Sequence, residues 1–163
     1  LLDFSPNTVY NVSERKGYEM TKLQAIREFA DFLAEGHTTI ARDRCDEGNW
    51  CMDIDNPTPR LKVPKDFDYR DDVDRAFRKD FTARCPLAKG FADVTLTILH
   101  EFGHWYNRNV MNIVVYDEMV QSEDNYFANP YEVLATQWAI CWLLCPTNRK
   151  IAKDFEKKYF GRV

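Results

Sequence analysis

Residues 91–107 read FADVTLTILHEFGHWYN, and this stretch decides the fold of the chain. If it forms a helix, apolar side chains occupy most of its sides: Val94, Leu96, Ile98, Leu99, Phe102 and Trp105. A helix that is apolar nearly all round belongs in the interior of a protein. The pattern therefore predicts a buried helix that carries two histidines into the core.

His100 and His104 are four positions apart on this predicted helix. Side chains at that spacing lie one above the other on the same face, so both imidazoles can reach one metal ion. Glu101 is placed to act as general base toward a water molecule activated by the metal. This is the chemistry of the His-Glu-x-x-His motif of zinc peptidases. The alternative is a pair of core histidines satisfied by ordinary hydrogen bonds.

A catalytic zinc site takes three protein ligands, so a third one is needed. Glu132 stands near the start of a second buried helix that we predict over residues 129–144. The run Asn129-Pro130-Tyr131-Glu132 also fits a capping box, in which the carboxylate would serve only the end of the helix. The histidine pair favours the ligand interpretation. Other candidates lie in the polar connection before this helix: Asp117, Glu118, Glu123 and Asp124.

The rest of the chain predicts further helices and a small sheet. Helices are expected over 21–35, where Gly36 would end the first, and over 67–82 and 147–160; short strands are expected at 38–41, 50–54 and 61–63. Gly103 should permit another backbone to approach the histidine helix closely. The fold class is thus α+β and dominated by helices. Met20 opens the first helix, so we expect residues 1–19 to be an N-terminal extension and 20–163 a single domain.

Composition excludes some classes of protein. The net charge of −4 and the pI near 5.4 argue against a nucleic-acid-binding surface, which needs a concentrated basic face. No apolar run is long enough to span a bilayer, so no membrane association is expected. The five cysteines form no Cys-x-x-Cys pair and have irregular spacing, which indicates reduced thiols and a cytoplasmic protein. Cys141 and Cys145 are expected to pack as small hydrophobic residues.

Residues 132–139, EVLATQWA, resemble the second motif of the ImmA/IrrE-type zinc metallopeptidases. That motif reads Glu-x-Glu-Ala-Asn-x-Phe-Ala and is followed by an apolar stretch and a proline. Pro146 lies close to the position of that proline. Leu134 replaces its second Glu, and Thr136 replaces its Asn. Together with the histidine motif, the likeness covers about residues 91–146. It implies a small glutamate-zincin fold and an endopeptidase of phage or mobile-element type. Its Zn²⁺ would be held by His100, His104 and Glu132, and its substrate would be a protein or peptide.

Two questions stay open at this level. A hydrogen-bond donor near the metal would stabilise the negative charge that builds on the peptide carbonyl oxygen, and four tyrosines compete for that role with plain packing: Tyr106, Tyr116, Tyr126 and Tyr131. The alternative to an enzyme is a non-catalytic zinc-binding regulatory or interaction module on the same frame, which predicts zinc without turnover or a site closed by a fourth protein ligand. His37 is expected at the surface, without a role in the site.

Overall fold

The computed structural model describes residues 21–35, 39–42, 50–55, 57–65, 67, 75–113 and 126–161, with β1 described by its backbone alone. A helix over residues 21–33 is followed by three strands and four further α-helices. Their bounds are β1 (Thr39–Arg42), β2 (Cys51–Asp53), β3 (Arg60–Val63), α2 (Arg75–Arg84), α3 (Asp93–Asn109), α5 (Pro130–Leu143) and α6 (Pro146–Tyr159). Two short 3-10 helices, η3 (Pro86–Gly90) and η4 (Tyr126–Ala128), precede α3 and α5. The fold is helix-dominated with a small sheet, as predicted.

The sheet has the strand order β1-β3-β2. β1 pairs with β3 in parallel, and β2 pairs with β3 antiparallel with Met52 opposite Leu61. All three strands overlap the segments predicted from the sequence. Leu61 and Val63 alternate with less buried neighbours along β3, so one face of this strand contributes to the core.

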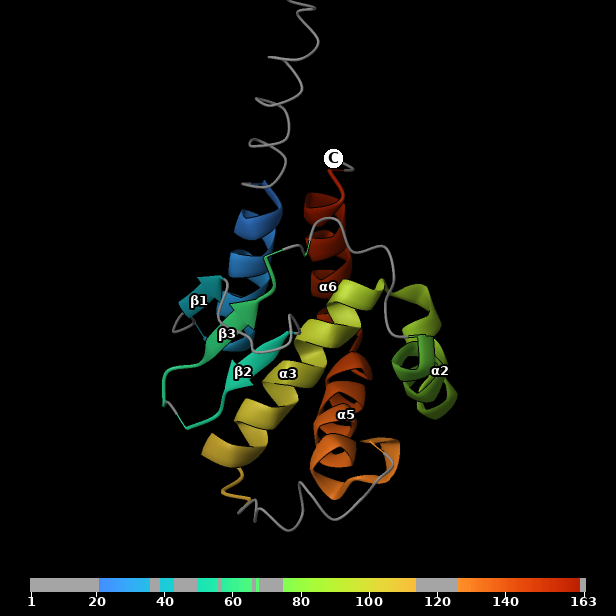
Figure 1. Ribbon diagram of the computed structural model, residues 1–163. Helices are drawn as coiled ribbons and strands as arrows, with labels where there is room; N and C mark the ends of the chain where they lie inside the picture. The colour runs from blue at the N-terminus through green and yellow to red at the C-terminus, as the bar shows by residue number, and fades with distance from the viewer. Residues whose placement is uncertain are drawn as a thin grey trace, which may run out of the picture.

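The histidine helix α3 lies between β2 and α5 (Figure 1). Its packing against α5 is close because Gly103 has no side chain. A Cβ atom at that position would lie 2.4 Å from the carbonyl oxygen of Ala135, well inside van der Waals contact. The prediction that Gly103 admits a second backbone is therefore confirmed. This contact brings together the two helices, α3 and α5, that carry the candidate ligands.

The N-terminus of α3 is capped by residues distant in sequence. Its N-cap residue, Ala92, has no side chain that can accept a hydrogen bond. Instead, the Glu156 carboxylate of α6 accepts hydrogen bonds from the Ala92 backbone N–H at 3.0 Å and from the Thr95 hydroxyl at 2.8 Å. The guanidinium of Arg78 in α2 donates to Asp93 in the first turn of α3 at 2.6 Å. Two neighbouring helices thus hold the start of α3.

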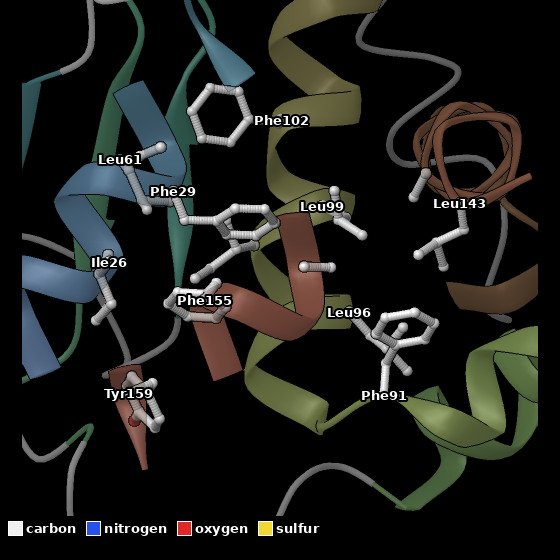
Figure 2. Packing of buried hydrophobic residues seen from close by; sticks show 14 of the residues in the cluster. Ile26, Phe29, Leu61, Phe91, Leu96, Leu99, Phe102, Leu143, Phe155 and Tyr159 are labelled. Atoms are coloured by element: carbon white, nitrogen blue, oxygen red, sulfur yellow. The ribbon is translucent and has the colours of Figure 1, made fainter. Parts of the chain in front are cut away.

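The core contains apolar side chains from α3, the sheet, the first helix and α6 (Figure 2). The ring of Phe29 in the first helix stacks on Phe155 of α6, with the ring centroids 4.6 Å apart. Phe102 of α3 and Leu61 of β3 are both buried in the same cluster. Because α3 supplies core residues, its histidines stand on a helix that is packed into the interior.

Two expectations about cysteine are wrong. Cys51 is disulfide-bonded, although the irregular spacing indicated reduced thiols; spacing along a chain does not report distance in space. Cys141 and Cys145 are exposed, not packed: the first lies on the outer face of α5 and the second is the N-cap residue of α6. Cys85 is free and buried as a small apolar residue. Within the described residues, no helix combines the length and the apolar character needed to cross a membrane.

Some predictions fall on residues outside those described. They concern the extension over 1–19, the helix stop at Gly36, His37 and the connection over 114–125 with its four acidic candidates and Tyr116. The predicted helix over 67–82 is described from Arg75 onward, as α2. The first helix is followed by a turn in which Glu35 has a φ of 55°.

Candidate metal centre

The start of α5 places Glu132 in its first turn. Pro130 opens the helix, and the Asn129 side chain accepts a hydrogen bond from the Tyr131 backbone N–H at 2.9 Å. Proline suits this position because the first backbone N–H groups of a helix have no partner within it. The Asn129 side chain caps the helix, and the Glu132 carboxylate contacts His100 and His104 of α3.

One oxygen of Glu132 contacts both histidines. Its Oε2 atom lies 2.7 Å from Nε2 of His100 and 3.0 Å from Nε2 of His104. The two imidazole rings are nearly perpendicular, with centroids 4.7 Å apart. A carboxylate oxygen of Glu101 and one nitrogen of each imidazole lie within 4.8 Å of one another. The four residues named from the sequence are thus brought together, and the group His100, Glu101 and His104 could hold a metal ion.

Burial and charge set the protonation of this cluster. Burial lowers the pKa of His100, which favours the neutral imidazole. Burial alone would raise the pKa of Glu132, but its hydrogen bonds to the two histidines outweigh that effect and hold the pKa well below its usual range. Burial raises the pKa of Glu101 to about 7, although the backbone amide of Met52 favours its charged form. These directions favour the neutral form of His100 and the ionised form of Glu132, which are the forms that bind metals.

Thr136 orients the first histidine. Its Oγ1 atom lies 3.0 Å from Nδ1 of His100, and both residues are buried. A hydroxyl that accepts the Nδ1–H proton leaves the Nε2 lone pair free for a metal. The Phe77 ring of α2 also packs on the His100 imidazole in a T-shaped arrangement, with 5.3 Å between centroids. His100 is therefore held by a directional hydrogen bond and by an aromatic contact.

His104 is held in a different way. Its ring stacks on the ring of Tyr131, with centroids 4.0 Å apart and an interplanar angle of 21°. Its Nδ1 atom is buried and has no hydrogen-bond partner among the described residues. The second histidine is thus positioned by its helix and by packing, without the hydrogen bond that accompanies most metal-binding histidines.

The donor set fits zinc. Two imidazole nitrogens and one carboxylate oxygen are the ligands of glutamate-type zinc sites, whereas Ca²⁺ and Mg²⁺ take oxygen ligands. In a tetrahedral Zn²⁺ site neighbouring ligand atoms are about 3.3 Å apart, as follows from bond lengths near 2.0–2.1 Å. The two distances from Glu132 Oε2, 2.7 and 3.0 Å, need only a small expansion to reach that separation.

The structure separates the candidate tyrosines. The Tyr126 hydroxyl lies 3.2 Å from Nε2 of His100, whereas Tyr131 presents its ring to His104. Tyr106 packs against Trp138, with ring centroids 5.4 Å apart. Sequence reasoning missed the contact of Thr136 with His100, although Thr136 lies one helical turn after Glu132 and therefore on the same face. It also missed Phe77, for which no sequence signal exists.

Comparison with known proteins adds no assignment: the chain matches no protein-family model, no curated protein and no solved structure. The function must therefore be inferred from the side chains of the site and their arrangement.

Proposed function

We propose that this chain is a zinc-dependent endopeptidase that hydrolyses a peptide bond in a protein or peptide. One observation carries the proposal: a single Glu132 oxygen lies 2.7 and 3.0 Å from the Nε2 atoms of His100 and His104, with Glu101 in the same cluster. A third ligand beside two imidazoles has to reach both of them, and this carboxylate oxygen does so. The likeness of residues 91–146 to ImmA/IrrE-type metallopeptidases supports the peptide bond as the target.

Each residue has a distinct role in this proposal. His100 and His104 bind zinc through Nε2, and Glu132 binds it through its carboxylate. When bound, Zn²⁺ supplies Lewis-acid chemistry, since it polarises a carbonyl group and lowers the pKa of water to near neutrality. The Glu101 carboxylate accepts the proton of the attacking water and can deliver it to the leaving nitrogen. Thr136 keeps the His100 ring in its orientation.

The zincin-like frame is part of the same proposal. A small sheet, a helix that carries the histidine pair and a second helix that carries a glutamate are the parts expected of a minimal glutamate zincin. Here α3 packs against β2 on one side and against α5 on the other. The Glu101 carboxylate is hydrogen-bonded by the Met52 backbone, so β2 contacts the proposed base directly.

Metal analysis tests the ligand set. We expect the purified protein to contain one Zn²⁺ per chain by emission spectroscopy and to lose it to a chelator. Glu132→Gln should reduce the zinc content severely, because a neutral amide is a poor ligand. The matched control is Glu28→Gln, which makes the same change on the exposed face of the first helix. Unchanged zinc in Glu132→Gln would show that the third ligand is another residue.

Proteolysis tests the reaction. The zinc-loaded protein should cleave members of a proteome-derived peptide library, with new termini identified by mass spectrometry. Glu101→Gln should retain zinc and lose cleavage by about a thousandfold or more, because it removes the base. A Glu101→Gln variant that cuts as fast as the parent would refute the proposed role of Glu101. Zinc without turnover on any peptide would favour the non-catalytic module.

A further inference from the structure

Tyr126 is placed at the candidate metal centre by two independent anchors. It opens η4, and its carbonyl oxygen accepts a hydrogen bond from the backbone N–H of Asn129, the N-cap residue of α5. The next residue, Phe127, accepts a hydrogen bond through its carbonyl oxygen from the Arg84 guanidinium of α2 at 3.2 Å. The short segment that carries Tyr126 is therefore tied to both helices that flank it.

The hydroxyl of Tyr126 lies close to the nitrogen of His100 that would bind the metal. Its separation from His100 Nε2 is 3.2 Å, and neighbouring groups around a tetrahedral Zn²⁺ are about 3.3 Å apart. The residue is 46% exposed, whereas His100 and His104 are buried. Tyr126 thus combines a hydroxyl at the metal-binding nitrogen with access to solvent, as required of a group that meets an incoming substrate.

The other described tyrosines do not combine these properties. Tyr131 uses its ring face to pack on His104. Tyr106 packs on Trp138.

We infer that Tyr126 is a catalytic residue whose hydroxyl donates a hydrogen bond to the carbonyl oxygen of the scissile peptide as that oxygen gains negative charge. The inference rests on the proposed endopeptidase function and assigns the hydrogen-bond donor that stabilises its transition state. The phenol keeps its proton throughout, so no atom is transferred to or from Tyr126. Removal of one such donor typically lowers kcat by about a hundred- to a thousandfold.

Binding of a small oxyanion tests this role without knowledge of the substrate. The full chain is loaded with Co²⁺, and acetohydroxamate is titrated against the absorption bands of the metal. We expect Tyr126→Phe to leave the Co²⁺ Kd and the spectrum of the unliganded site unchanged. It should weaken acetohydroxamate about ten- to a hundredfold, the usual effect of losing a hydrogen bond to a charged group. Tyr106→Phe removes the hydroxyl of a tyrosine in α3 that packs on Trp138, and it should change neither the Co²⁺ Kd nor the acetohydroxamate affinity.

Each other outcome has a definite meaning. Equal acetohydroxamate affinity in Tyr126→Phe and the parent overturns the inference and leaves the proposed function intact. A weaker Co²⁺ Kd or an altered resting spectrum in Tyr126→Phe overturns it as well, because Tyr126 would then be a fourth metal ligand and the site a closed one. Parent protein that binds Co²⁺ but no acetohydroxamate also indicates a closed site. Parent protein that binds neither Co²⁺ nor Zn²⁺ overturns the proposed function itself.

Discussion

The two histidines of the candidate metal centre lie one helical turn apart, yet their surroundings differ. His100 has a hydrogen-bond partner for each ring nitrogen, with Thr136 at Nδ1 and Glu132 and Tyr126 at Nε2. His104 shares only Glu132, and its other nitrogen has no partner among the described residues. Its ring is held by the face of Tyr131.

This contrast shows two ways to orient a metal ligand. A hydrogen bond at Nδ1 fixes both the tautomer and the rotation of an imidazole, whereas stacking fixes the plane of the ring and leaves the tautomer free. The cost of the unpaired Nδ1 of His104 is of the order of 1–3 kcal/mol. The His100 side of the site should therefore be the more sensitive to loss of a supporting residue, and the following changes test that difference.

The largest effect is expected from the contact that supports both histidines at once. In Gly103→Ala the new methyl group would lie 2.4 Å from the Ala135 carbonyl oxygen, so α3 and α5 must separate. Helix propensity favours alanine over glycine by about 1 kcal/mol, but overpacking costs up to about 3 kcal/mol or more, and the second effect wins. Urea unfolding should show a loss of about 2 kcal/mol, and zinc affinity should fall sharply.

The control for Gly103→Ala is Gly90→Ala. A Cβ atom at Gly90 meets nothing within 4 Å, so the free energy of unfolding should change by no more than about 0.5 kcal/mol. If both variants behaved alike, the close approach of α3 and α5 would not be what positions the ligands.

The next effect comes from making His100 resemble His104. Thr136→Val keeps the size of the side chain and removes the hydroxyl at 3.0 Å from His100 Nδ1. Loss of such an outer partner typically lowers metal affinity about ten- to a hundredfold. Competition with a zinc-binding dye measures the change, and Thr136→Ser, which retains the hydroxyl, should restore most of the affinity. Parent-like affinity in Thr136→Val would mean that the hydrogen bond at His100 is dispensable.

A smaller effect is expected at His104. Tyr131→Leu removes the stacked ring, and a ring contact of this kind contributes about 0.5–1.5 kcal/mol. Zinc affinity should therefore fall less than tenfold or so. Tyr131→Phe keeps the ring and should behave like the parent protein. A loss in Tyr131→Leu that exceeds the loss in Thr136→Val would reverse the comparison between the two histidines.

The smallest effect on zinc affinity is expected from a change at the N-terminus of α3. Glu156→Gln weakens the cap on Ala92 and Thr95 and should lower the free energy of unfolding of the metal-free protein by about 1 kcal/mol. Zinc affinity should stay within twofold or so of the parent, because the cap lies in the first turn of α3, more than one turn before His100. Asp154→Asn, an exposed change on α6, serves as control for the loss of charge. A marked loss of zinc in Glu156→Gln would show that the whole of α3 responds to its cap.

Much of the frame follows from local patterns. The three strands and the helices α3, α5 and α6 lie where periodicity and helix-boundary residues predict them, within a few residues. The Asn129-Pro130 start of α5 is one such case, since both residues act within their own helix turn. The cysteines are the counterexample, because the exposure of Cys141 and the disulfide bond of Cys51 depend on the rest of the fold.

The candidate site divides along the same line. The i and i+4 spacing is enough to put His100 and His104 on one face of a helix, since that depends only on helix geometry. The histidine pair then favours Glu132 as the third ligand, because it stands near the start of a second buried helix, and the likeness to a metallopeptidase motif agrees. Its rivals in the polar connection lie outside the described residues, so the structure does not compare them with it.

The amino-acid order alone therefore specified the buried helix, the histidine pair and the glutamate at the start of the second helix. It also specified Gly103, at which the two helices approach each other. The three-dimensional fold was needed for the rest: the shared oxygen of Glu132, the partner of His100, the stacked ring on His104 and the hydroxyl of Tyr126. The reason is physical. Local patterns report interactions within a turn or two of one element, whereas these contacts join α3 to residues 26 to 36 positions away through packing.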